Sequence, residues 1–313
     1  MEKVSLDWLS FRRLPIAAVA AVALLLAACA AQPTTPAPAD IPFGQGRVWQ
    51  VEGKGIKPSY VFGTIHSTDR RVRELPAAVR TAFDAADAAA FELVDIGKAE
   101  TEPAAAILLT EGRRLEEILG AELFQRTAAA VAPLGVPAVA LQRLKPWALV
   151  GLLGVPPVEL VRQVQGEPVL DAWMESEARR QGKAVHGLES LQEQIALFEN
   201  LSDDDQIVMV TDLLNNYGGI QTQFDRLLQS YLDGNLAALM AEVDDLSRTS
   251  DVEATARFRN ELIDERNRTM VERMLPLMAQ DATFVAVGAA HLPGEAGILA
   301  LLERQGFTVT RLH

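Results

Sequence analysis

Apolar and polar residues alternate in two short stretches near the start of the folded region, a pattern typical of half-buried β-strands. The first stretch runs from Val48 to Glu52 and the second from Ser59 to Ile65, and a Gly-Lys-Gly turn signal lies between them at 53–55. Two strands joined so closely predict an antiparallel hairpin. A short apolar run follows at 88–94 and predicts a buried strand.

Helical spacing dominates the middle of the chain, from about residue 103 to residue 280. Apolar residues recur there every three or four positions, as expected for helices that bury one face. One short strand pattern, at 184–188, interrupts this region. The helices that we expect, including one before the middle, lie at 73–86, 114–130, 144–153, 170–181, 191–200, 204–215, 220–233 and 257–278.

The end of the chain has the clearest succession of elements. A buried strand is expected at 283–287, a helix at 297–304 and a last strand at 307–312. This order predicts a parallel pair of strands with a right-handed crossover. Strands near both ends with helices between them predict an α/β (α+β) fold, in which N- and C-terminal strands form a central mixed sheet and the helices form a large insertion.

Residues 1–28 are typical of a secretory signal peptide. A basic start that extends to Arg13 precedes an apolar run at 14–28, which is short for a membrane-spanning helix and ends in small residues. The one cysteine of the chain, Cys29, follows the order Leu-Ala-Ala. This order resembles a bacterial lipobox, so we expect lipidation of Cys29. The alternative is a signal-peptide cysteine without a role.

The segment after the cysteine is rich in Pro, Ala and Thr and predicts an extended tether over 29–42, followed by one domain over 43–313. We therefore expect a lipoprotein that faces the periplasm and is held on a membrane through Cys29. Ala30, rather than Asp, after the cysteine favours the outer membrane. The net charge of −13 argues against nucleic-acid binding.

Two histidines follow the same local plan. His66 and His291 each come three residues after a glycine, Gly63 or Gly288, that ends an apolar strand. Ligands collect at the carboxyl ends of strands in open α/β sheets. If the two strands are neighbours, the imidazoles can converge on a site that suits Mn, Fe, Co, Ni or Zn. Otherwise they are two unrelated loop histidines.

One acidic and one basic residue are further candidates. Glu92 ends an apolar strand, where a carboxylate is costly unless it is paired or metal-bound. It is a candidate third ligand or general base, or else it faces water. Arg266 shares a helix face with Met270 and Met274 and therefore needs an anionic partner if that face is buried. A solvated helix face is the alternative.

These residues resemble a known family. The chain is similar, over about 43–313, to the TraB/GumN family, which includes the Tiki proteases and the pheromone shutdown proteins. The segments that carry the resemblance are Gly63-Thr64-Ile65-His66, Phe91-Glu92, Leu188-Glu189-Ser190 with Gln194, Arg266-Asn267 and Val287-Gly288-Ala289-Ala290-His291-Leu292-Pro293-Gly294. Many members have Trp and then Gly-Asp where this chain has Tyr231, Gly234 and Asn235.

The resemblance implies a metal-dependent, peptidase-like hydrolase that acts on an envelope or secreted peptide, with Mn, Co or Zn as the metal. It implies that His66 and His291 are metal ligands and that Glu92 is a ligand or a base toward a metal-bound water. Arg266 would stabilise a developing oxyanion or lock a carboxylate. The alternative is a non-catalytic envelope lipoprotein that binds a ligand or scaffolds an assembly related to polysaccharide.

Overall fold

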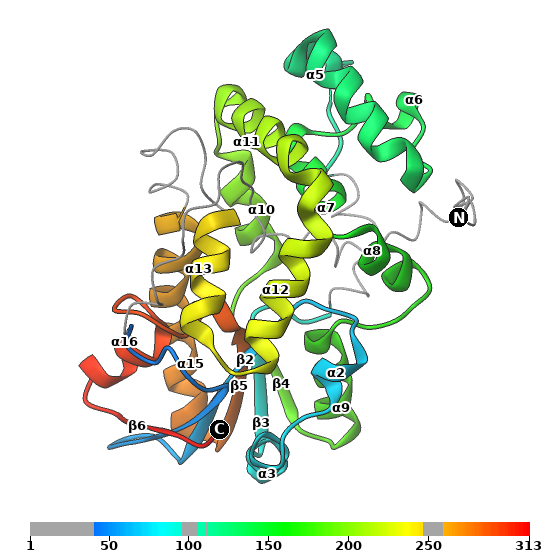
Figure 1. Ribbon diagram of the computed structural model, residues 1–313. Helices are drawn as coiled ribbons and strands as arrows, with labels where there is room; N and C mark the ends of the chain where they lie inside the picture. Colours follow the sequence, from blue (N-terminus) through cyan, green and yellow to red (C-terminus); the bar gives the residue numbers. More distant parts are fainter. Residues whose placement is uncertain (1–40, 96–105, 111, 247–258) are drawn as a thin grey trace.

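The computed structural model describes residues 41–95, 106–110, 112–246 and 259–313. The signal peptide, Cys29 and almost all of the tether that the sequence predicts lie outside these ranges. The described residues place strands from both ends of the chain in one sheet, which lies in the lower half of Figure 1.

A six-stranded mixed sheet forms the centre of the fold, in the order β4-β3-β5-β2-β1-β6. The strands β4, β3, β5 and β2 are parallel neighbours, whereas β1 pairs antiparallel with both β2 and β6. This confirms the predicted α/β fold and the opening hairpin. The strands are β1 (Val48–Glu52), β2 (Ser59–Thr64), β3 (Ala88–Phe91), β4 (Ala184–Gly187), β5 (Thr283–Gly288) and β6 (Thr308–Arg311).

The apolar content of each strand matches its place in the sheet. Every residue of the two inner strands β3 and β5 is buried, as expected for parallel strands that are covered on both faces. The edge strands β4 and β6 have no fully buried residue. The inner strands therefore provide a dry platform on which side chains at the strand ends can meet.

The predicted pairing of the last two strands is wrong in one respect. β5 and β6 do run in the same direction, but β2 and β1 lie between them. The places beside β5 are taken by β2 and β3, which are more apolar than β6. The Thr-Val-Thr-Arg sequence of β6 instead suits a sheet edge, where polar side chains reach water.

Helices fill most of the chain between β3 and β5. They include three α-helices that the sequence analysis did not single out, α6, α8 and α13. The helices are α2 (Arg70–Arg73), α3 (Ala77–Ala85), α5 (Leu115–Val131), η3 (Ala132–Leu134), α6 (Ala138–Leu141), η4 (Pro146–Leu149), α7 (Val150–Leu153), α8 (Pro157–Val164), α9 (Leu170–Arg180), α10 (Leu191–Glu199), α11 (Asp203–Asn216), η5 (Tyr217–Gly219), α12 (Ile220–Leu232), α13 (Leu236–Leu246), η6 (Asn260–Glu265), α15 (Arg266–Gln280), η7 (Ala289–His291) and α16 (Ile298–Arg304).

Two expected helices are interrupted. Pro76 is the N-cap of α3 and separates it from the short helix α2, because proline disfavours helical geometry at the residue before it. The first two residues of the helix expected at 257–278 lie outside the described residues, and the described part contains a π-helical turn, η6, directly before α15. Such turns occur frequently at functional sites.

The helices contact the sheet at different strands. α3 contacts β2, α9 contacts β3 and β4, α15 contacts β5 and α16 contacts β6. In Figure 1, α5, α6 and α11 lie at the upper end, away from the sheet. Within the described residues no single helix is long and apolar enough to cross a membrane, although the bent pair Pro146–Leu153 and Pro157–Val164 meets the criteria of length and composition.

Candidate functional site

Three adjacent strands bring the candidate residues to one edge of the sheet. β3 pairs in parallel with β5, and β5 pairs in parallel with β2. Glu92, His291 and His66 each follow the end of one of these strands. All three therefore leave the sheet at its carboxyl edge, the place where ligands collect in parallel sheets. The two Gly-x-x-His segments lie on neighbouring strands, as the hypothesis of a joint site requires.

Glycine at position 63 allows these two segments to approach each other. A Cβ atom at Gly63 would lie 3.0 Å from the Leu292 side chain and 3.1 Å from the Cα and Cβ of Ala289. These distances are shorter than ordinary van der Waals contact, so a larger residue would push the His66 and His291 segments apart.

Glu92 is a buried carboxylate with a partner at each oxygen. Oε1 accepts the backbone N–H of Gly288, and Oε2 accepts a hydrogen bond from Arg266 Nη2 at 3.0 Å. Burial raises the pKa of Glu92, but the charges of Arg266 and His66 and the Gly288 hydrogen bond outweigh burial and lower it to about 2. Glu92 is thus ionised at neutral pH and does not face water.

Arg266 connects Glu92 to a second buried carboxylate, Glu189. Its Nε lies 2.9 Å from Glu189 Oε1 and its Nη2 lies 2.7 Å from Glu189 Oε2, while Nη1 donates to the carbonyl of Leu262 at 3.1 Å. The side chains of Arg266 and Glu189 are 4% and 5% exposed. Since most guanidinium donors are occupied, this geometry fits a role in locking carboxylates better than a role in binding an oxyanion.

His66 is paired with an acidic residue from the helical insertion. Its Nδ1 lies 2.9 Å from Asp171 Oδ2, and Asp171 also accepts a hydrogen bond from the Thr64 hydroxyl. Burial lowers the pKa of His66, but the charge and hydrogen bond of Asp171 and the charge of Glu92 raise it to about 9. His66 therefore carries a proton at neutral pH as long as no cation displaces it.

His291 has the opposite character. It is fully buried, and its Nδ1 lies 2.7 Å from Asn267 Oδ1. Its Nε2 lies 3.7 Å from Glu92 Oε1 and has no hydrogen-bond partner within the part of the chain that the structure describes. Burial lowers the pKa of His291 to about 3, so the ring is a neutral imidazole.

The residues at this edge fit a divalent metal in kind. Two imidazoles and a carboxylate are suitable ligands for Mn, Co or Zn, and the buried Nε2 of His291 is a donor atom without a partner. His66 would have to release its proton to bind. Among the described residues, no group of three or more His, Cys, Asp or Glu side chains is already in position to hold a metal. The candidate side chains would therefore have to close around an ion.

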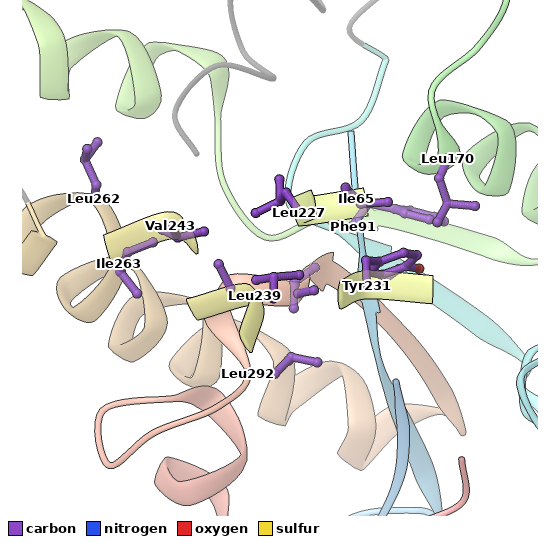
Figure 2. Packing of buried hydrophobic residues seen from close by; sticks show 14 of the residues in the cluster. Ile65, Phe91, Leu170, Leu227, Tyr231, Leu239, Val243, Leu262, Ile263 and Leu292 are labelled. Atoms are coloured by element: carbon purple, nitrogen blue, oxygen red, sulfur yellow. The ribbon is translucent and has the colours of Figure 1, made fainter. Parts of the chain in front are cut away.

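Apolar side chains surround the site. Figure 2 shows Ile65, Phe91 and Leu292, the sequence neighbours of His66, Glu92 and His291, in one buried cluster with residues of α12 and α13 such as Tyr231 and Leu239. These surroundings exclude water, so the charges at the site act on one another strongly.

Four contributors were missed as site residues by the sequence analysis: Asp171, Glu189, Asn267 and Tyr231. Asp171 and Glu189 come from the helical insertion, and Glu189 and Asn267 had only their places in the family segments as a signal. Tyr231, which stands where many family members have Trp, is fully buried, and its hydroxyl donates to the carbonyl of Gly63 at 2.9 Å. No local pattern points to Asp171, because an acidic residue in the first turn of a helix is common.

Comparison with protein families matches residues 47–311 to the TraB/PrgY/gumN family. The chain belongs to this family. The match covers all six strands of the sheet and every candidate site residue. The family resemblance that the sequence segments suggested is therefore confirmed.

Curated relatives carry the name metalloprotease. The chain is 26% identical to "Metalloprotease TIKI1" of Danio rerio, across 84% of this chain and 62% of that protein. It is 26% identical to "Metalloprotease TIKI homolog" of Nematostella vectensis across 84% and 66%, and 25% identical to "Metalloprotease TIKI1" of Homo sapiens across 84% and 61%. The chain thus spans about three fifths of the length of the first of these relatives. No solved structure matches the chain significantly.

Proposed function

We propose that this TraB/PrgY/gumN family member is a metal-dependent hydrolase that cleaves peptide bonds. The observation that carries the proposal is the meeting of His66, Glu92 and His291 at the carboxyl edge of the sheet, where the Nε2 of His291 lies 3.7 Å from the ionised Glu92. The similarity to proteins named metalloproteases supports this reading.

The residues of the site have distinct tasks in this proposal. His66, His291 and Glu92 hold the cation, which supplies Lewis-acid polarisation of the scissile carbonyl when bound. A general base works best with a pKa near the working pH. Because the pKa of Glu92 is about 2, Glu92 is better suited to ligation than to proton abstraction. Arg266 and Glu189 keep its carboxylate in place.

Metal content and metal-dependent thermal shift test the proposed site. The full chain is purified without chelators, beside His66→Ala, His291→Ala and His186→Ala, and each is titrated with Mn²⁺, Co²⁺ and Zn²⁺. His186 is the matched control because it lies on edge strand β4, is only partly buried and is not one of the proposed ligands. A cation at 100 times its Kd stabilises the folded state by about 2.7 kcal/mol.

We expect near-stoichiometric metal binding and a metal-dependent rise in Tm for wild type and His186→Ala. Both should be lost in His66→Ala and His291→Ala. Equal binding by all four proteins, or no binding by any, would contradict the metal site. Cleavage of a mixed peptide library, followed by mass spectrometry with and without the bound ion, then tests catalysis. Binding without cleavage would favour the alternative of a ligand-binding lipoprotein.

We also propose that the protein is anchored in the cell envelope through lipidated Cys29. The lipobox-like order before Cys29 and the tether after it support this anchor. Expression in a bacterial host with radiolabelled palmitate, for wild type and Cys29→Ala, tests it. We expect label and membrane fractionation in wild type only, and labelling of both proteins would contradict the proposal.

A further inference from the structure

Asn267 lies between His291 and the loop that follows this histidine. It is completely buried, its Oδ1 lies 2.7 Å from His291 Nδ1, and its Nδ2 donates to the carbonyl of Ala296 at 2.9 Å. It also follows Arg266 directly, at the start of α15 and just after the π-helical turn η6. Asn267 therefore supports the site from the side opposite to Glu92.

The contact with Ala296 fixes which end of the Asn267 amide faces the histidine. A backbone carbonyl can only accept, so the amide nitrogen must point toward Ala296 and the oxygen toward His291. The amide oxygen can also only accept. It follows that Nδ1 of His291 carries the hydrogen and that Nε2 of the neutral ring is a lone pair.

Glu92 alone would favour the other tautomer. Its Oε1 lies 3.7 Å from His291 Nε2, so a ring with hydrogen on Nε2 would direct that hydrogen toward the carboxylate. The same ring would direct its Nδ1 lone pair at the oxygen of Asn267, where two acceptors repel. Asn267 and Glu92 thus compete for the position of one hydrogen.

We propose that Asn267 is a positioning residue that holds His291 in the Nδ1–H form and so keeps the Nε2 lone pair available to a divalent cation. The part that concerns the cation rests on the proposed function, whereas the tautomer is a property of the metal-free protein. Ligating histidines characteristically donate their second ring N–H to such a partner, and loss of the partner weakens metal affinity about 10–100-fold.

A purely structural role is the competing explanation, because Asn267 also attaches the loop at Ala296 to α15. Two substitutions separate the roles. Asn267→Leu has a similar shape and removes both contacts. Asn267→Asp keeps an acceptor for His291 but has no N–H for Ala296. The hydrogen bond to the carbonyl of Ala296 is lost in both variants, whereas the acceptor for His291 is lost only in Asn267→Leu.

Long-range ¹H–¹⁵N spectra of the histidine rings give the direct test. The full chain is labelled with ¹⁵N and kept at pH 7.5 with chelator, and His291 is assigned from the His291→Ala variant among the four histidines of the sequence. The matched control is Asn216→Leu, since Asn216 is another buried helical asparagine whose amide donates to a backbone carbonyl. Mn²⁺, Co²⁺ and Zn²⁺ affinities are measured on the same proteins by calorimetry.

We expect the Nδ1–H form of His291 in wild type, Asn267→Asp and Asn216→Leu, and a shift toward the Nε2–H form in Asn267→Leu, with metal affinity about 10–100-fold weaker in that variant alone. An Nε2–H ring in wild type, or equal losses in Asn267→Leu and Asn267→Asp, would overturn the inference. The Nδ1–H form in a wild-type protein that binds no metal would refute the proposed function and leave the positioning role intact.

Discussion

Replacing Arg266 with methionine should destabilise the protein because it leaves two buried carboxylates without their shared cation. Arg266 donates to Glu189, to Glu92 and to the carbonyl of Leu262, and its side chain is 4% exposed. Methionine preserves much of the apolar stem but none of the donors. The carboxylates of Glu92 and Glu189 would then repel each other at a site that is shielded from water.

Two independent estimates give the expected loss in the free energy of unfolding. Removing one partner of a buried ion pair typically costs about 3–5 kcal/mol. The carboxylates can avoid part of this cost if one takes up a proton. For a glutamate with the ordinary pKa of 4.5, protonation at pH 7 costs about 3.4 kcal/mol, since each pH unit corresponds to about 1.36 kcal/mol. At pH 5 the same proton costs less than about 1 kcal/mol. The destabilisation should therefore shrink by about 2–3 kcal/mol between pH 7 and pH 5.

Urea unfolding at both pH values, extrapolated linearly to water, measures these differences. Arg268→Met is the control on the same helix, because Arg268 is half exposed and its ion pair with Glu265 lies at the surface, where such pairs contribute little. If the free energy of unfolding of Arg266→Met lies within about 1 kcal/mol of the wild-type value at pH 7, the loss falls below the range for a buried ion pair. That result would refute the view that Arg266 stabilises buried charge. A loss that stays the same at pH 5 would refute the ionised state of Glu92.

Two further predictions concern His66 and Tyr231. The pKa of His66 is about 9 in the folded protein and 6.5 in the unfolded chain, so its stabilisation of the metal-free protein, about 3 kcal/mol, is complete below pH 6.5 and is lost as the pH rises through 9. Urea unfolding in chelator at pH 6.5 and 9.5 should reveal this loss, and Asp171→Asn should make it smaller; an equal loss in both proteins would contradict the assignment to Asp171. Tyr231→Phe should cost about 1–2 kcal/mol by thermal unfolding, because the buried carbonyl of Gly63 loses its hydroxyl donor, and an unchanged Tm would contradict it.

The fold could be predicted from the sequence where a local pattern determines the element. The apolar run before Glu92 and the alternation at 48–52 each became a strand, since burial on two faces or one leaves a direct signature. The order of the strands in the sheet could not be predicted in this way. The sequence of 307–312 does not indicate that β2 and β1 lie between β5 and β6, because strand order depends on competition among all strands for the covered positions.

The site was predictable to a similar extent. His66, Glu92 and His291 lie at strand ends, and Arg266 lies on an apolar helix face. Each is a polar side chain at a position where its local sequence already indicates a functional or paired role. Asp171 has no such mark. It is one acidic residue among many in the helical middle, and only the folded chain brings it within 2.9 Å of His66.

The two Gly-x-x-His segments look alike in sequence, yet the structure gives their histidines different properties. His66 meets a charged partner, Asp171 of α9, and its side chain is 17% exposed. His291 meets a neutral partner, Asn267 of α15, and is fully buried. An anionic partner favours a protonated ring, whereas burial beside a neutral amide favours an uncharged one. The strands thus bring the two rings to the same edge of the sheet, and the partners supplied by α9 and α15 decide that one ring carries a proton and the other offers a lone pair.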